Sequence, residues 1–117
     1  TVIERTNIRH APPDLFPEPF DVITIDVSFI SLKIVFPAIL KFLNPRTDII
    51  ALIKPQFEVG KGKVGKGGVV RDAALHQDVI DELSGFLPTI GLRAGNIVPS
   101  PISGPKGNRE FLMHATR

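Results

Sequence analysis

The chain has 117 residues, of which 43% are hydrophobic, and this suits one small folded domain or a piece of a larger one. It contains no cysteine, which excludes a disulfide framework, a thiolate metal site and a cysteine nucleophile. The formal net charge of +2 identifies no partner by itself, no apolar run is long enough to span a bilayer, and no signal-peptide pattern opens the chain.

The first half of the sequence predicts two buried strands joined by a helix. Four prolines between residues 10 and 19 indicate a surface loop. Residues 21–27 and 48–53 are almost continuously apolar, as in strands that are covered on both faces. Between them, apolar residues recur every three or four positions over residues 31–43, which predicts a helix. Pro37 lies inside this stretch and indicates a late start or a kink.

The second half predicts a helix followed by two strands. After a connection rich in glycine and lysine, Asp72 caps a helix whose apolar stripe runs to about residue 90. Strands are expected at residues 92–98 and 110–115 with a turn-rich stretch between them. Alternating strands and helices favour an α/β fold with a parallel sheet, and the last two strands must form an antiparallel hairpin.

Three charged residues stand at the predicted strand ends. Asp26 and Lys54 come at the carboxyl ends of the first two strands, where ligand crevices form in open α/β sheets. Glu110 opens the last strand and approaches the same crevice if that strand pairs beside the Lys54 strand. The alternative is that Asp26 and Lys54 simply mark where strands leave the core, and that Glu110 is an ordinary polar residue at a strand start.

The connection between residues 55 and 71 is basic and flexible in composition. It resembles a nucleotide-binding P-loop in spacing, but Gly67 stands where a Ser or Thr must hold magnesium, so we exclude an NTPase. Contact with RNA phosphates and a plain solvated loop both remain open for it. The candidate RNA-binding residues are Lys61, Lys63, Lys66 and Arg71.

Two other kinds of site find no support in the sequence. The three histidines have no carboxylate spacing that would make a metal site. Trp and Tyr are absent and most Phe residues fit core positions, so we expect no aromatic surface on which bases could stack.

Four segments of the chain, in this order, resemble the TlyA or hemolysin A family of FtsJ-like methyltransferases. They are ERTN (residues 4–7), IDVSFISL (25–32), LIKPQFE (52–58) with GGVVRD (67–72), and SPISGPKGNREFL (100–112). The resemblance implies a partial Rossmann-like class I methyltransferase fold, a three-layer αβα arrangement with a C-terminal antiparallel hairpin. It also implies methyl transfer from S-adenosylmethionine to a ribose 2′-hydroxyl of ribosomal RNA, with ribosomal subunits as partners.

The same resemblance assigns roles to individual residues. FtsJ-like enzymes use a Lys-Asp-Lys-Glu tetrad, in which Asp26, Lys54 and Glu110 match the Asp, the second Lys and the Glu. Asn7 matches a position near the adenine of the cofactor, and Asp26 one near its methionine end. Lys54 would be the base or the stabiliser of the developing oxyanion, and the two carboxylates would hold its ammonium.

The resemblance also places part of the enzyme upstream of residue 1. The glycine-rich cofactor loop, the first tetrad lysine and an S4-type RNA-binding domain would all precede this chain, so we expect the fragment alone to be inactive. The strand over residues 21–27 would then present an open edge that can support a homodimer. A non-catalytic, ribosome-associated RNA-binding module is the alternative function. A cytolysin is a weaker alternative, because the sequence shows no amphipathic or membrane-spanning segment. An rRNA-modifying protein would be cytoplasmic.

Overall fold

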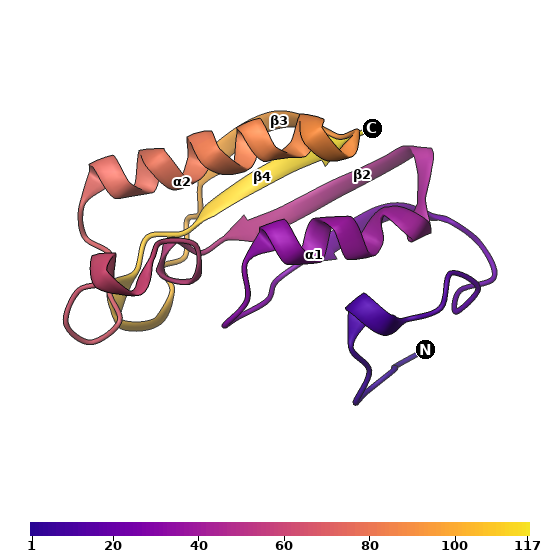
Figure 1. The fold of residues 1–117 in the computed structure, drawn as a ribbon, viewed down its shortest axis with the longest axis horizontal. Helices are drawn as coiled ribbons and strands as arrows, with labels where there is room; N and C mark the ends of the chain where they lie inside the picture. Colours follow the sequence, from indigo (N-terminus) through magenta and orange to yellow (C-terminus); the bar gives the residue numbers. More distant parts are fainter.

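The computed structural model describes residues 1–117 apart from the side chain of Lys61. Over these residues four strands form one sheet in the order β1-β2-β4-β3. They are β1 (Phe20–Ile25), β2 (Leu43–Ile53), β3 (Arg93–Pro99) and β4 (Phe111–Thr116). β1 pairs parallel with β2, whereas β4 runs antiparallel to both β2 and β3. The predicted C-terminal hairpin is therefore confirmed, and β4 lies between the two strands that it opposes (Figure 1).

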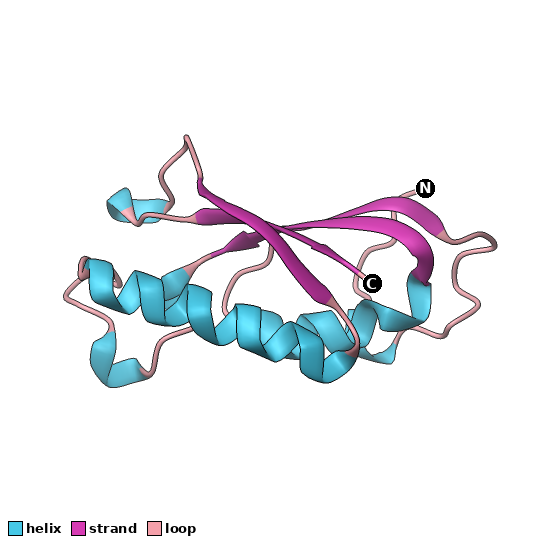
Figure 2. Cartoon of the chain, turned by 90° about the horizontal axis from the view of Figure 1, so that it is seen from above, coloured by secondary structure: helices cyan, strands magenta, loops and turns pink.

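Two helices, α1 (Leu32–Ile39) and α2 (Ala73–Phe86), cover the same face of the sheet (Figure 2). The described elements therefore make two layers, and the second helical layer of the expected αβα arrangement is not formed by them. No helix in the described part of the chain has the length and apolar character needed to cross a membrane.

Helix α1 is shorter than the sequence predicted, and β2 is longer. Ser31 caps α1 by accepting a hydrogen bond from the Lys33 amide at 3.1 Å. Pro37 is accommodated inside the helix, which ends two residues later in a 3₁₀ turn. β2 then starts at Leu43, five residues before the predicted strand. Its early residues are bulged against β1, because Phe20 pairs with Leu43 but Val22 pairs with Asp48.

Helix α2 begins and ends as its sequence predicts. The Asp72 side chain accepts a hydrogen bond from the Ala74 amide at 2.8 Å and so caps the first turn. The helix passes into a 3₁₀ turn at Leu87, and Gly91 ends it in the left-handed region at φ 82°. The buried residues His76, Val79 and Leu83 recur at helical spacing and face the sheet.

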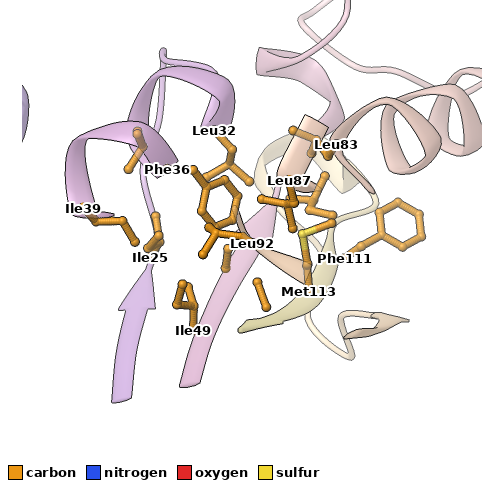
Figure 3. Packing of buried hydrophobic residues seen from close by; sticks show 14 of the residues in the cluster. Ile25, Leu32, Phe36, Ile39, Ile49, Leu83, Leu87, Leu92, Phe111 and Met113 are labelled. Carbon is orange, nitrogen blue, oxygen red and sulfur yellow. The ribbon is translucent and has the colours of Figure 1, made fainter. Parts of the chain in front are cut away.

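The core lies between the helices and one face of the sheet (Figure 3). Alternate residues of the two central strands point into it, which is the two-residue period of a strand. Phe36 of α1 is completely buried, and it belongs to the same hydrophobic cluster as Val79 and Leu83 of α2. The central strands contribute Ile49, Ala51, Ile53, Phe111, Met113 and Ala115.

The opposite face of the sheet carries apolar side chains without a helix over them. Val22 and Val98 are about half exposed on the outer strands. Leu52 and Leu112 are paired in register between them and alternate with the core residues. An apolar sheet face of this kind is normally covered in a folded protein, because leaving it in water loses the benefit of burial.

Candidate active site

The carboxyl ends of β1 and β2 bring Asp26 and Lys54 together. These strands are parallel neighbours, so the residues that follow them emerge at the same edge of the sheet. Lys54 Nζ lies 2.6 Å from Asp26 Oδ1 and donates a hydrogen bond to Ser28 Oγ at 3.1 Å. The two residues that the sequence analysis placed at strand ends thus form one ion pair, and Ser28 is an addition to them.

The Lys54 ammonium is enclosed whereas its carboxylate partner is open. The Lys54 side chain is 12% exposed and that of Asp26 is 70% exposed. An ammonium has three N–H donors, and two of them are used by Asp26 and Ser28. The third can donate to a molecule that binds at this edge, and the exposed carboxylate can accept from a second polar group of that molecule.

Glu110 lies at the same edge, at the start of β4. Ile53 pairs with Phe111 at the end of the ladder, so the preceding Glu110 comes opposite Lys54 in the continuing register. Glu110 is buried, with 6% of the residue exposed, and its carboxylate accepts a hydrogen bond from Gln56 Nε2 at 3.0 Å. Glu110 therefore contacts the Lys54 segment through Gln56 in this structure, and its expected contact with the ammonium itself is not formed among the described side chains.

A tight turn before β4 holds Glu110 in place. The Gly104 amide donates to the Asn108 carbonyl at 2.8 Å, and a Cβ on Gly104 would collide with the Glu110 carboxylate. Asn108 is buried; its Oδ1 accepts from the Val70 amide at 2.9 Å, and its Nδ2 donates to the Gly68 carbonyl at 2.9 Å. Sequence reasoning gave Asn108 no role, although both segments that it joins belong to the motifs noted above.

Phe29 corrects the expectation that the chain has no aromatic surface. It is 90% exposed, and its backbone is in the left-handed region at φ 63°, which is uncommon for a bulky residue. Its ring lies 4.9 Å from the ring of Phe57, between centroids, in a tilted arrangement. Its hydrophobicity alone predicts a core position. The loop conformation, which local sequence patterns do not reveal, turns the ring outward instead.

The two rings border an open, mostly apolar cleft of about 410 Å³, next to the segments that follow Asp26 and Lys54. Gln56, which holds Glu110, also lines it. Lys106 also lines the cleft and lies beside Gly67. The turn before β4 therefore lies close to the glycine-rich connection at this point. The full lining is Phe29, Gln56, Phe57, Val64, Gly67, Gly68, Pro105, Lys106 and Asn108.

The other predicted binding residues are placed unevenly. Lys63, Lys66 and Arg71 are exposed on the connection between β2 and α2, as a phosphate-binding surface requires. The side chain of Lys61 lies outside the described part of the structure. Asn7 is exposed and accepts a hydrogen bond from the Arg9 amide at 3.0 Å, which caps a short turn. No hydrogen bond among the described atoms joins Asn7 to the Asp26 and Lys54 pair.

Glu58 is a further site residue that the sequence analysis did not identify. It is partly buried and accepts hydrogen bonds from Ser31 Oγ at 2.6 Å and from the Leu32 amide at 2.8 Å. Burial raises the pKa of the Glu58 carboxyl above its usual value, and these two hydrogen bonds oppose part of that rise. Among the described side chains no group of three or more His, Asp or Glu could hold a metal ion.

Comparison with known proteins identifies relatives of the chain. The family model of the FtsJ-like methyltransferases matches residues 1–117. The chain is 46% identical over 114 residues to "Putative rRNA methyltransferase YqxC" of Bacillus subtilis, with 97% of this chain and 41% of the relative covered. It is 40% identical over 112 residues to "16S/23S rRNA (cytidine-2'-O)-methyltransferase TlyA" of Mycobacterium tuberculosis, with 96% and 42% covered.

A solved structure agrees with the sequence comparison. "The crystal structure of a putative hemolysin from Lactococcus lactis" superposes with a TM-score of 0.93 at 38% identity, and covers 99% of this chain and 56% of that one. The chain therefore spans about two fifths of the length of the two curated relatives and about half of this solved chain.

Proposed function

Because the chain belongs to the FtsJ-like methyltransferase family, we propose that it is the C-terminal part of an enzyme that methylates ribose 2′-hydroxyls of ribosomal RNA. The names of the two curated relatives support the substrate class. The single observation that carries the proposal is the Lys54 ammonium, which Asp26 and Ser28 fix at the edge where both parallel strands end. We propose a cytoplasmic location for it, because its proposed substrate is ribosomal RNA.

The residues present fit one end of the S-adenosylmethionine cofactor. The cofactor supplies a methyl group on a positively charged sulfur. Asp26 is exposed, uses Oδ1 for Lys54, and offers a negative charge that complements the amino group of the cofactor's methionine end. We propose that Asn7 contributes near the adenine, and that the glycine-rich loop and first tetrad lysine belong to a preceding segment of the complete protein.

The chain's own residues can orient the attacking hydroxyl. A ribose hydroxyl is a poor nucleophile, so alignment and charge stabilisation supply most of what an enzyme can add. In this arrangement Lys54 donates its remaining N–H to the 2′-oxygen and stabilises negative charge there, while the hydroxyl proton passes to solvent. Asp26 fixes the direction of the ammonium, and Glu110 fixes Gln56 in the turn that follows Lys54.

The nucleotide would bring its 2′-oxygen to Lys54 from the side of the cleft. The exposed ring of Phe29, beside the half-buried Phe57, offers an aromatic surface for a base, and stacking on such a ring is worth about 1–3 kcal/mol per base. Lys63, Lys66 and Arg71 would bind neighbouring phosphates.

We further propose that the uncovered side of this fold is interior in the complete protein. The free edge of β1 and the apolar face of the sheet would be covered by a preceding strand and helices, which completes the three-layer αβα arrangement. The isolated chain would then be inactive, and its β1 edge could pair with a second copy.

Methyl transfer from labelled S-adenosylmethionine to ribosomal subunits tests the proposal. Full-length protein should label ribose in the RNA, and Lys54→Ala should lose about 100-fold or more of the rate while still binding RNA. Lys63→Ala is the matched control and should weaken binding in a salt-dependent way with the rate at saturation intact. A wild-type protein that binds ribosomal RNA but labels none of it would overturn the proposal in favour of a non-catalytic RNA-binding module.

A further inference from the structure

Two loops of the site run side by side and touch at three places. The first loop joins β1 to α1 and spans residues 26–31; the second leaves β2 and spans residues 54–58. At one end Lys54 binds Asp26 and Ser28, and in the middle Phe57 contacts Phe29. These two contacts contain the groups that the proposed function uses.

The third contact closes the other end of this pair of loops. Glu58 Oε2 accepts from Ser31 Oγ at 2.6 Å, and Oε1 accepts from the Leu32 amide at 2.8 Å. Both carboxylate oxygens are therefore used. One binds the side chain of Ser31, the last residue of the first loop, and the other binds the backbone amide of Leu32, the first residue of α1. A carboxylate at a helix N-terminus is stabilised by the unpaired amides there, so the geometry is favourable as well as bidentate.

Glu58 is itself fixed relative to Lys54. The intervening turn is held by backbone hydrogen bonds from the Phe57 amide to the Lys54 carbonyl at 2.9 Å and from the Glu58 amide to the Pro55 carbonyl at 3.0 Å. Pro55 is buried and allows little freedom at the exit of β2. The restraint that Glu58 places on Ser31 and Leu32 is therefore anchored in the same rigid turn that carries Lys54.

The first loop needs such a restraint because its conformation is unfavourable. Phe29 holds a positive φ of 63° while the residue is 90% exposed, so its own burial contributes little to keep it there. The strained residue lies between the two clamped ends of the loop. Releasing one end would let Phe29 relax and move Asp26 and Ser28 with respect to the ammonium.

We propose that Glu58 is a positioning residue for methyl transfer, which sets the loop carrying Asp26, Ser28 and Phe29 against the turn carrying Lys54. This inference rests on the proposed function, because the reaction gives the positions their meaning. It goes beyond a helix cap: a cap that served stability alone could be provided by Ser31, which already accepts from the Lys33 amide.

The kinetic test compares three variants of the full-length protein on ribosomal subunits. Glu58→Ala should lower kcat by about 10- to 100-fold, as expected for a misplacement of about 1 Å, with KM for RNA within about twofold of wild type. Glu58→Gln should restore most of kcat, because its carbonyl accepts from the Leu32 amide and its amide group can donate to Ser31. Glu82→Ala is the matched control, since it removes a nearby surface carboxylate that pairs with Lys33 outside the two loops, and its kcat should be unchanged.

Hydrogen exchange separates this inference from the proposed function. In Glu58→Ala, amide protection should fall across residues 26–32 while α2 keeps its protection, whatever the activity of the wild-type protein. Unchanged protection in that loop would overturn the inference. So would a kcat per folded molecule equal to that of the wild type, since Glu58 would then serve stability only. A wild-type protein without methyl transfer would instead refute the proposed function.

Discussion

Gly104 packs directly against the carboxylate of Glu110, and no room is left between them for a side chain. A Cβ built on Gly104 would collide with Glu110 Oε2 and would lie 3.1 Å from Oε1. The backbone of Gly104 has a φ of −76°, which any residue can adopt. The requirement for glycine is therefore steric and is set by the position of one buried carboxylate.

Gly104→Ala is predicted to displace the Glu110 carboxylate and break its hydrogen bond with Gln56. Overpacking at a buried site costs about 1–3 kcal/mol of unfolding free energy, and a displaced Glu110 should also slow methyl transfer by about tenfold or more. Urea denaturation and labelled methyl transfer measure the two effects. Gly60→Ala is the control because its Cβ would meet nothing within 4 Å, and equal behaviour of the two variants would contradict the prediction.

Phe29 and Phe36 should respond to alanine in opposite ways. Phe36 is completely buried at the centre of the core, so Phe36→Ala should cost about 3–5 kcal/mol of unfolding free energy. Phe29 is 90% exposed, and Phe29→Ala should cost less than about 1 kcal/mol. If the exposed ring binds a base, Phe29→Ala should nevertheless raise KM for RNA about tenfold. A normal KM in a stable Phe29→Ala protein would exclude the stacking role.

The elements that could be predicted from the sequence are those with one dominant physical cause. Ile25, Ile49, Ala51 and Ile53 are apolar because the core requires it, and the strand rule then places Asp26 and Lys54 at one edge. The early start of β2 was missed because its first residues pair with β1 through a bulge, in which the buried Thr47 hydroxyl donates to the Phe20 carbonyl across 27 residues of the chain.

The missed site residues depend on pairs of distant segments. Glu58 accepts a hydrogen bond from Ser31, 27 residues away in the sequence, and Asn108 accepts one from Val70, 38 residues away. Neither partner is visible from local periodicity, because each bond exists only after the strands have placed the loops side by side. Phe29 was missed for a related reason, since the contacts on both ends of its loop turn an apolar residue outward.

Glu58→Gln should change how stability depends on pH. Burial is the main cause that raises the folded-state pKa of Glu58 above its usual value of 4.5. The stability that this group contributes is therefore fully present below the unfolded pKa and is lost as pH rises through the folded pKa. The glutamine of the variant carries no charge to desolvate. Among the charged neighbours of Glu58, Lys33 lowers the pKa of its carboxyl and Glu82 raises it.

Unfolding free energies of the two proteins at pH 4 and pH 7 measure this effect. The difference between Glu58→Gln and wild type should move in favour of the variant as pH rises, by about 1.4 kcal/mol for each tenfold change that folding makes in the acid dissociation constant of Glu58. The opposite sign, with wild type gaining on the variant towards pH 7, would mean that the hydrogen bonds from Ser31 and Leu32 outweigh burial.

The basic connection should bind RNA through charge alone. Lys63 and Lys66 are exposed, so each lysine that contacts a phosphate should account for about 0.7–0.9 of the slope of log affinity against log salt. Replacing both by alanine should reduce the slope by about twice that amount with no change in the preferred sequence. Filter binding of ribosomal RNA over a range of salt concentrations measures it, with Lys33→Ala as the control because its ammonium pairs with Glu82. An unchanged slope in the double variant would assign the connection to solvent and leave Lys106, at the rim of the aromatic cleft, as the next cation to replace.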